Sequence, residues 1–196
     1  MKTVGEIIQR SNGSKKLQAL WQDSPQRMML VNKYGDREAF LLTFNPDYQK
    51  IICGNTDECF FGDYPTLAIL KEGYGRNAAS LWLLPQLNNL SEYCGCKEKL
   101  EGKAIEECAF IIATDFFYLK ISELMLFFHR FKTGRYGRFY GSVDPLIITT
   151  ALREFITERS SEIDRMEQIK REKKNAEHRK GAISYEEWKR RKSLTL

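Results

Sequence analysis

The sequence predicts a mainly α fold: a compact helical body with a small β-meander near the N-terminus and a long charged helix at the C-terminal end. From residue 65 onward, apolar side chains recur every three or four positions, which is typical of helices that lie on a core. Before that point they come in short runs flanked by turn-forming residues, as strands do. The chain has 196 residues, of which 42% are hydrophobic, so it can form one core but not two large domains.

The short apolar runs are residues 28–31, 40–44 and 49–53, and turn-forming residues such as Gly35 and Pro46 separate them. Periodicity alone cannot distinguish runs of this length from helix, but their flanks favour strands. We therefore expect a small β-meander in this N-terminal segment.

Three helices are expected next. A short one over residues 66–72 ends at Gly73. A longer one over residues 77–93 contains Pro85, which removes a backbone hydrogen bond and predicts a kink or a restart. The third, over residues 97–119, repeats apolar residues on one face and should pack on the helix that follows it.

Two further helices are expected after residue 120. The first, over residues 123–133, has an apolar face rich in phenylalanine and ends at Gly134, whose backbone freedom suits a helix C-terminus. The second begins at Asp144-Pro145, because aspartate caps helix N-termini and proline fits the first turn. Its charged pattern continues toward Gly181, which predicts one long helix.

The net charge of +5 comes from 31 basic and 26 acidic residues, and the excess is confined to one end of the chain. Residues 1–158 hold 19 of each sign, whereas residues 159–196 hold 12 basic and 7 acidic residues. The sequence thus divides into an N-terminal segment (residues 1–64), a helical core domain (residues 65–158) and a basic helical tail (residues 159–196).

The stretch FFHRFKTGRYGRFYG, residues 127–141, is the strongest candidate for a binding surface. Cations alternate in it with aromatic residues, and no acid occurs between Glu123 and Asp144. Basic side chains neutralise phosphates and aromatic rings stack on unpaired bases, so this pattern favours nucleic acid, with DNA as the expected partner. Alternatively, the phenylalanines belong to the core and the tyrosines hold the loop to the body. The candidate nucleic-acid-binding residues are Arg130, Lys132, Arg135, Tyr136, Arg138 and Tyr140.

The end of the tail predicts a short capped helix that begins at Tyr185. Ser184 and Glu187 have the spacing of a capping box, and Ile183 and Trp188 have that of a hydrophobic staple. A short helix with one apolar face fits a groove on a protein partner, although fraying in solution is the alternative. The candidate docking residues are Ile183, Tyr185, Trp188, Arg190 and Arg191.

Signals for an enzyme, a metal site or a membrane span are weak. His129 and His178 have no evident nucleophile or orienting carboxylate, so no catalytic residue can be assigned. The five cysteines lack the spacing of a zinc knuckle, and their odd number is unlike a disulfide framework. No run approaches the roughly 18 apolar residues of a membrane helix, and the first residues lack the apolar core of a signal peptide. We expect a cytoplasmic, non-enzymatic protein without cofactor or metal.

Residues 117–159 contain the motif FFxRFKxGxYGxFYGxVDPxxIxxALxxFxxER with every fixed letter present. This stretch, together with residues 65–90, resembles a family of uncharacterised proteins carried by phages and conjugative elements of anaerobic gut bacteria. The resemblance implies a mobile element in a bacterial host cell as the setting, and it implies no reaction. The architecture also resembles that of phage helicase loaders, whose charged C-terminal segment grips the helicase. That likeness implies a replicative helicase, or another host or phage protein, as a partner.

The function that these patterns favour is that of a non-enzymatic accessory protein in DNA replication or processing, which contacts nucleic acid and docks on a protein partner. The alternative is a protein-interaction module, such as an inhibitor of a host enzyme or a phage assembly factor, that does not bind nucleic acid. In that case the basic and aromatic loop is structural and the tail folds on its target.

Overall fold

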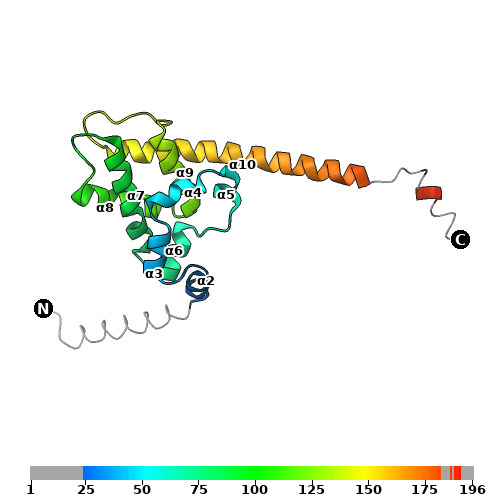
Figure 1. Ribbon diagram of the computed structural model, residues 1–196, viewed down its shortest axis with the longest axis horizontal. Coiled ribbons are helices and arrows are strands. Elements are labelled where there is room, and N and C mark those ends of the chain that lie inside the picture. The colour runs from blue at the N-terminus through cyan, green and yellow to red at the C-terminus, as the bar shows by residue number, and fades with distance from the viewer. Residues whose placement is uncertain (1–23, 182–185, 187, 191–196) are drawn as a thin grey trace. The chain divides into compact units, whose positions relative to one another are not determined.

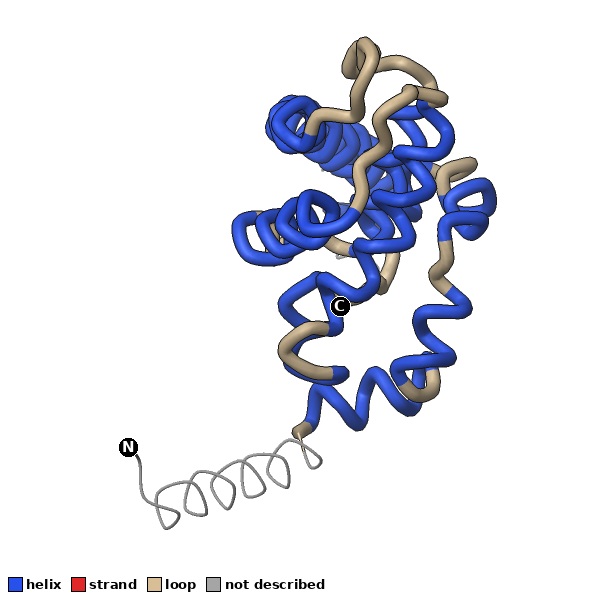
Figure 2. The backbone as a smooth tube through the Cα atoms, turned by 90° about the vertical axis from the view of Figure 1, so that its left-hand side faces the viewer, coloured by secondary structure: helices blue, strands red, loops and turns tan. Residues whose placement is uncertain are grey.

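Helices form all the regular secondary structure of the described residues, which are 24–181, 186 and 188–190 of the computed structural model (Figure 1). Figure 2 shows them as helices joined by loops, with no strand among the described residues. The chain divides into two units, residues 1–153 and 154–196, with the boundary inside the last helix. The elements are α2 (Pro25–Tyr34), α3 (Arg37–Thr43), η1 (Pro46–Tyr48), α4 (Gln49–Ile52), α5 (Thr56–Phe61), α6 (Leu67–Tyr74), α7 (Ala78–Cys94), α8 (Gly102–Asp115), α9 (Ile121–Lys132) and α10 (Pro145–Gly181).

The expected β-meander is wrong, because the segment that should contain it folds into α2, α3, η1 and α4. The residues that suggested turns between strands are helix caps. The Ser24 side chain accepts a hydrogen bond from the Arg27 amide at 3.1 Å, and the Asp36 side chain accepts one from the Ala39 amide at 2.8 Å. Asn45 caps η1 in the same way. The described residues contain two isolated β-bridges and no strand.

Burial in this N-terminal segment follows helical spacing. Phe40 and Phe44, four residues apart, are 1% and 2% exposed, while Leu42 between them is 74% exposed. Their rings contact each other at 4.7 Å between centroids, and both contact the ring of Tyr34. In a strand, residues 40, 42 and 44 would lie on the same face and be buried or exposed together. Burial of residues 40 and 44 with exposure of residue 42 is instead the pattern of a helix.

The unit of residues 1–153 is organised around α9. All positions of α9 from Ile121 to Phe128 are buried, as is Phe131, and the helix contacts α4, α5 and α7. α7 in turn packs on α6, α8 and α9 through fully buried side chains that include Trp82 and Leu87. A helix buried on every side lies inside its domain, so α9 is the central element of this unit.

α7 runs as a single helix from Ala78 to Cys94, with Pro85 inside it and exposed. The expected restart at Pro85 therefore does not occur. The helix ends at Gly95, whose φ of 65° places it in the left-handed region that closes helices. This ending places Tyr93 and Cys94 beside the end of α9.

Hydrogen bonds fix the start of α9 against the segment that precedes α6. The Ile121 amide donates to the Pro65 carbonyl at 3.0 Å, and the Leu67 amide donates to the Leu119 carbonyl at 3.0 Å. The Ser122 hydroxyl donates to the Cys59 carbonyl at 2.7 Å, and the Lys120 ammonium donates to two further carbonyls of α5 and its end. The position of α9 is thus set at its first turn by groups from an earlier part of the chain.

The long C-terminal helix expected from Asp144-Pro145 is confirmed as α10. The Asp144 side chain accepts a hydrogen bond from the Leu146 amide at 2.8 Å, which caps the first turn. Ile148 and Leu152 are buried, whereas the side chains of residues 170–179 are all exposed. Among the described residues, none of the helices combines the length and the apolar composition needed to cross a bilayer.

Candidate nucleic-acid interface

The candidate interface is built on the loop of residues 133–144, which joins α9 to α10. Two aromatic residues of the loop, Phe139 and Tyr136, hold it against α9. The ring of Phe139 stacks on that of Phe131, with 5.2 Å between centroids and 17° between planes. Tyr136 is half-buried, and its ring lies 5.6 Å from that of Phe127 and 6.0 Å from that of Phe131. Tyr136 and Phe139 therefore order the loop.

Backbone hydrogen bonds tie the loop at both ends. At its start, the Gly134 amide donates to the Phe131 carbonyl at 2.9 Å. At its end, the Glu98 amide donates to the Gly141 carbonyl at 3.2 Å and the Val143 amide donates to the Glu98 carbonyl at 3.0 Å, which joins the loop to the segment after α7. All three glycines of the loop have positive φ, 83°, 92° and 81°, which a side chain would disfavour.

Lys132 is the last residue of α9, and its half-buried side chain points back into the body. Its ammonium donates to Gln49 Oε1 at 2.8 Å and to Asn89 Oδ1, and it lies 5.9 Å from the centroid of the Tyr93 ring. Both acceptors are neutral amide oxygens. Burial lowers the pKa of Lys132 from its usual 10.5, because removal from water disfavours the charged form.

The Lys132 ammonium closes a chain of buried amide hydrogen bonds. Gln49 Nε2 donates to Gln86 Oε1 at 2.7 Å, and Gln86 Nε2 donates to the Phe44 carbonyl at 3.0 Å. The Trp82 indole donates to the same carbonyl at 2.9 Å. Gln49 and Gln86 are 2% and 0% exposed, so this network satisfies polar groups that water does not reach. Lys132 thereby links α9 to α4 and α7.

The six predicted nucleic-acid-binding residues lie in different environments. Arg135, Arg138 and Tyr140 are exposed, and Tyr140 is 87% exposed. Lys132 and Tyr136 are half-buried and contact the body as described above. Arg130 is half-buried on α9 beside Cys59. The structure thus brings three of the six to the surface of one loop.

The positive charge of Arg130 acts to lower the pKa of two thiols near α4 and α5, those of Cys53 and Cys59. A hydrogen bond with Cys53 is the main cause that lowers the pKa of the Cys59 thiol, and the positive charge of Arg130 lowers it further. The same hydrogen bond and burial raise the pKa of Cys53. All five cysteines are free.

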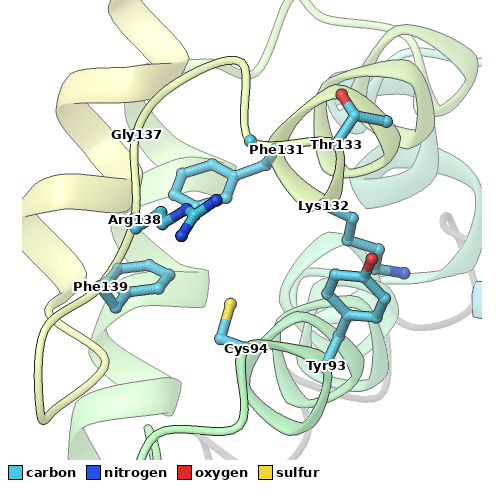
Figure 3. A pocket seen from close by; sticks show the side chains of 9 residues that line it. Tyr93, Cys94, Phe131, Lys132, Thr133, Gly137, Arg138 and Phe139 are labelled. Atoms are coloured by element: carbon cyan, nitrogen blue, oxygen red, sulfur yellow. The ribbon is translucent and has the colours of Figure 1, made fainter.

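A pocket of about 340 Å³ opens between the loop and the ends of α7 and α9 (Figure 3). In Figure 3 the Arg138 side chain lies next to the Phe131 and Phe139 rings, and Tyr93 lies across the pocket beside Lys132. Two cations and no acid line this pocket. Its lining residues are Tyr93, Cys94, Phe131, Lys132, Thr133, Gly134, Gly137, Arg138 and Phe139.

Tyr93 and Cys94 belong to this site although sequence reasoning did not place them there. They end a helix that lies well before the loop in the chain, and only the packing of α7 on α9 brings them to Arg138. Tyr93 is 64% exposed, and burial raises the pKa of the Cys94 thiol. One signal was present: an aromatic residue at the end of an apolar helix, shortly before a glycine that closes it.

The residues that could hold a metal ion do not gather here. In the part of the chain that the structure describes, His, Cys, Asp and Glu side chains form no group of three or more that could ligate one.

The predicted docking unit of the tail is described only in part. Trp188 is 46% exposed and Arg190 is exposed, both in a short helical stretch. Ile183, Tyr185 and Arg191 lie outside the described residues.

The comparisons with known proteins support a likeness to one family of unknown function. Neither the curated proteins nor the solved structures contain a match to the chain. Residues 99–195 match a family of unknown function, DUF6633, and this span includes α8, α9, the loop and α10. Over this C-terminal region, which contains all six predicted nucleic-acid-binding residues, the chain is therefore similar to the DUF6633 family.

Proposed function

We propose that the protein binds nucleic acid through the surface around the loop of residues 133–144 and acts, without enzymatic activity, as an accessory protein in DNA replication or processing. The observation that carries the proposal is the acid-free pocket lined by Arg138, on a loop that also exposes Arg135 and Tyr140. The likeness of residues 117–159 to proteins of phages and conjugative elements supports a mobile element as the setting.

The charges of the loop suit a phosphate backbone. Arg135 and Arg138 are three residues apart on an ordered loop, and both side chains reach solvent. Arginine binds phosphate oxygens through several N–H groups at once, and each phosphate neutralised releases bound counterions. Tyr140, exposed on the same loop, offers a ring on which a base can stack.

The proposal predicts a salt-dependent affinity that two arginines largely determine. Anisotropy of a labelled DNA oligonucleotide, single-stranded or duplex, should report binding that weakens steeply between about 50 and 200 mM salt, as is general for such complexes. The variant Arg135→Gln/Arg138→Gln should bind about tenfold more weakly. Its plot of log affinity against log salt should be shallower by about 0.7 to 0.9 for each phosphate that the variant no longer neutralises.

The matched control removes two exposed cations from another surface of the same unit, Lys71→Gln/Arg76→Gln. This variant has the same net charge as the loop variant but keeps the loop. Equal reductions of affinity in the two variants would show that net charge, and not the loop, determines binding. Absence of salt-dependent binding by the unmodified protein would contradict the proposed function as a whole.

A second candidate function, a protein-interaction module, is favoured by the exposed apolar side chains of α8 and its end. Phe110 and Phe117 are 64% and 52% exposed, and Ile111 and Tyr118 are 43% exposed each. Exposed aromatic and aliphatic side chains are frequent in protein contacts. Such a partner could be a host enzyme or a component of phage assembly.

Cross-linking in nuclease-treated host lysate would test this second function with the variants Phe110→Ser/Phe117→Ser and Arg135→Gln/Arg138→Gln. Loss of one specific adduct in the first variant and its retention in the second would support a partner on α8. An unchanged adduct pattern in the first variant would contradict it.

A further inference from the structure

We propose that the pocket between the loop and the ends of α7 and α9 receives one unstacked nucleobase of a single-stranded nucleic acid. This inference rests on the proposed function and specifies its ligand. It predicts that the protein prefers single strands to duplexes, because a paired base inside a duplex cannot enter a side pocket.

The size of the pocket suits a small planar group. Its volume of about 340 Å³ is at the lower end of the range of about 300–1,000 Å³ for ligand pockets, so it accommodates one base with its sugar and not an extended ligand. Its walls come from three segments, α7, α9 and the loop, and these segments are joined by the packing and hydrogen bonds described above. The pocket is therefore formed before any ligand binds, which reduces the entropic cost of binding.

Aromatic rings border the pocket on two sides. Phe139 is held in place by its stacking on Phe131, and Tyr93 is 64% exposed at the opposite side (Figure 3). The Lys132 ammonium, 5.9 Å from the Tyr93 centroid, attracts the electron-rich face of that ring and favours its observed position. A base that enters between α7 and the loop can thus stack on a ring that already faces the pocket.

The charges of the lining match a nucleotide as well. Arg138 extends into the pocket from the loop and is placed to bind the phosphate next to the bound base (Figure 3). Lys132 also lines the pocket, but its ammonium is turned toward Gln49 and Asn89, so Arg138 is the lining cation that a phosphate can reach. Two other surface pockets of this unit have an acidic residue in their lining, Glu72 in one and Asp47 in the other. Those pockets are less suited to a phosphate.

Tyr93→Leu tests the inference, because Tyr93 is exposed and the fold should tolerate its replacement. Affinity for a single strand of about 15 nucleotides should fall about 5- to 150-fold, the range expected for the loss of one base–aromatic stack, while affinity for a duplex of the same sequence should not change. The control is Tyr118→Leu, which removes an exposed tyrosine from the end of α8 and should alter neither affinity.

Photochemical cross-linking gives an independent readout. The same single strand with 5-iodouracil in place of each thymine couples on irradiation to adjacent aromatic side chains, and mass spectrometry locates the adduct. An adduct on Tyr93 or Phe139 is the expected result.

Three results would count against the inference. Equal affinity for single strand and duplex, with Tyr93→Leu as active as the unmodified protein and Arg135→Gln/Arg138→Gln impaired, would overturn the base pocket and leave the proposed function intact. An adduct on the tail or on α8 would also overturn the pocket. Absence of any salt-dependent binding would overturn both proposals together.

Discussion

Lys132 places its ammonium against two amide oxygens, those of Gln49 and Asn89, at the edge of a buried network. Removing this charge from water costs free energy. The hydrogen bonds that the ammonium donates to the two amide oxygens offset this cost. A cation that the sequence suggests for ligand binding is therefore also a structural group, and its two roles can be separated by measuring stability without ligand.

Lys132→Met should lower the free energy of unfolding by about 1–3 kcal/mol, because the amide oxygens of Gln49 and Asn89 lose their donor. Urea denaturation without nucleic acid measures this. The control is Lys50→Met, whose side chain is 81% exposed and pairs with Asp47 at 3.1 Å on the surface, and it should change stability by less than about 0.5 kcal/mol. Equal stability of the Lys132 and Lys50 variants would contradict a structural role for Lys132.

Tyr74 predicts how stability depends on alkaline pH. It is 6% exposed, and its hydroxyl donates to the Gly35 carbonyl at 2.8 Å and the Leu30 carbonyl at 3.2 Å. Burial raises the pKa of Tyr74 from 10.0 to about 12. A raised folded-state pKa of an acid means that its contribution is complete below pH 10 and is lost as the pH rises toward 12.

Tyr74→Phe should lower the free energy of unfolding by about 1 kcal/mol at pH 7 and should lose less stability than the unmodified protein between pH 10 and 12. Urea titrations across this pH range measure both effects. Tyr118→Phe, which removes an exposed hydroxyl, is the control and should retain the original pH profile. Parallel pH profiles of the Tyr74 variant and the unmodified protein would show that Tyr74 does not cause the decline.

At the scale of elements, α2 and α6 pack closely because α6 has a glycine at the contact. A Cβ atom built on Gly73 would lie 2.4 Å from Leu30 Cδ1, and Leu30 is 0% exposed. The helices can therefore keep this distance only while residue 73 lacks a side chain.

Gly73→Ala should destabilise the protein by about 1–3 kcal/mol, because the added methyl group overpacks the contact with Leu30. Leu30→Ala is itself destabilising, but it removes the atoms that the added methyl group would meet, so the double variant should be more stable than the sum of the two single effects predicts. Gly54→Ala is the control, since its Cβ would come no closer than 3.7 Å to another atom. Thermal unfolding of these variants and the unmodified protein gives the comparison, and strictly additive effects would contradict a direct clash.

The helices after residue 60 could be predicted from sequence, whereas those before it could not. α9 and α10 have long apolar repeats and strong end signals at Gly134 and Pro145, so their existence and approximate limits follow from pattern. In the N-terminal segment the helices are only one to three turns long, and no repeat is long enough to establish a period. Asp36 and Asn45 indicate the boundary of a secondary-structure element, but the same residue types occur at helix caps and in turns between strands.

The candidate site shows a similar division. Arg135, Arg138 and Tyr140 could be proposed from the acid-free stretch itself, because their charge and ring are visible in the local sequence. Sequence alone could not predict that Tyr93 lines the pocket or that Lys132 makes buried hydrogen bonds. Both depend on how α7, α9 and α4 pack. The expected alternative, in which tyrosine holds the loop to the body, applies to Tyr136 and not to Tyr140.

At the scale of the whole molecule, burial differs sharply between helices and predicts a gradient of local stability. α9 is buried at almost every position, whereas the side chains of residues 170–179 in α10 are all exposed. Backbone amides exchange slowly where opening would expose much buried apolar surface, and fast where a helix end can fray.

Hydrogen–deuterium exchange should therefore be slowest in α9 and much faster in residues 170–179. Mass spectrometry of peptic fragments at two protein concentrations measures this. Protection of residues 170–179 that increases with concentration would show that a second copy of the chain covers them. Protection equal to that of α9 at both concentrations would contradict the predicted gradient.

The hydrogen bonds between the start of α9 and the segment around Pro65 also have a consequence for the order of folding. Pro65 and Ile121 are distant in the chain, so this contact closes a long loop that contains α6, α7 and α8. A ribosome delivers these helices before α9, so they emerge without the helix that buries their apolar faces. Synthesis in the cell should therefore leave the growing chain without a complete core, and dependent on protection from aggregation, until α9 has left the exit tunnel.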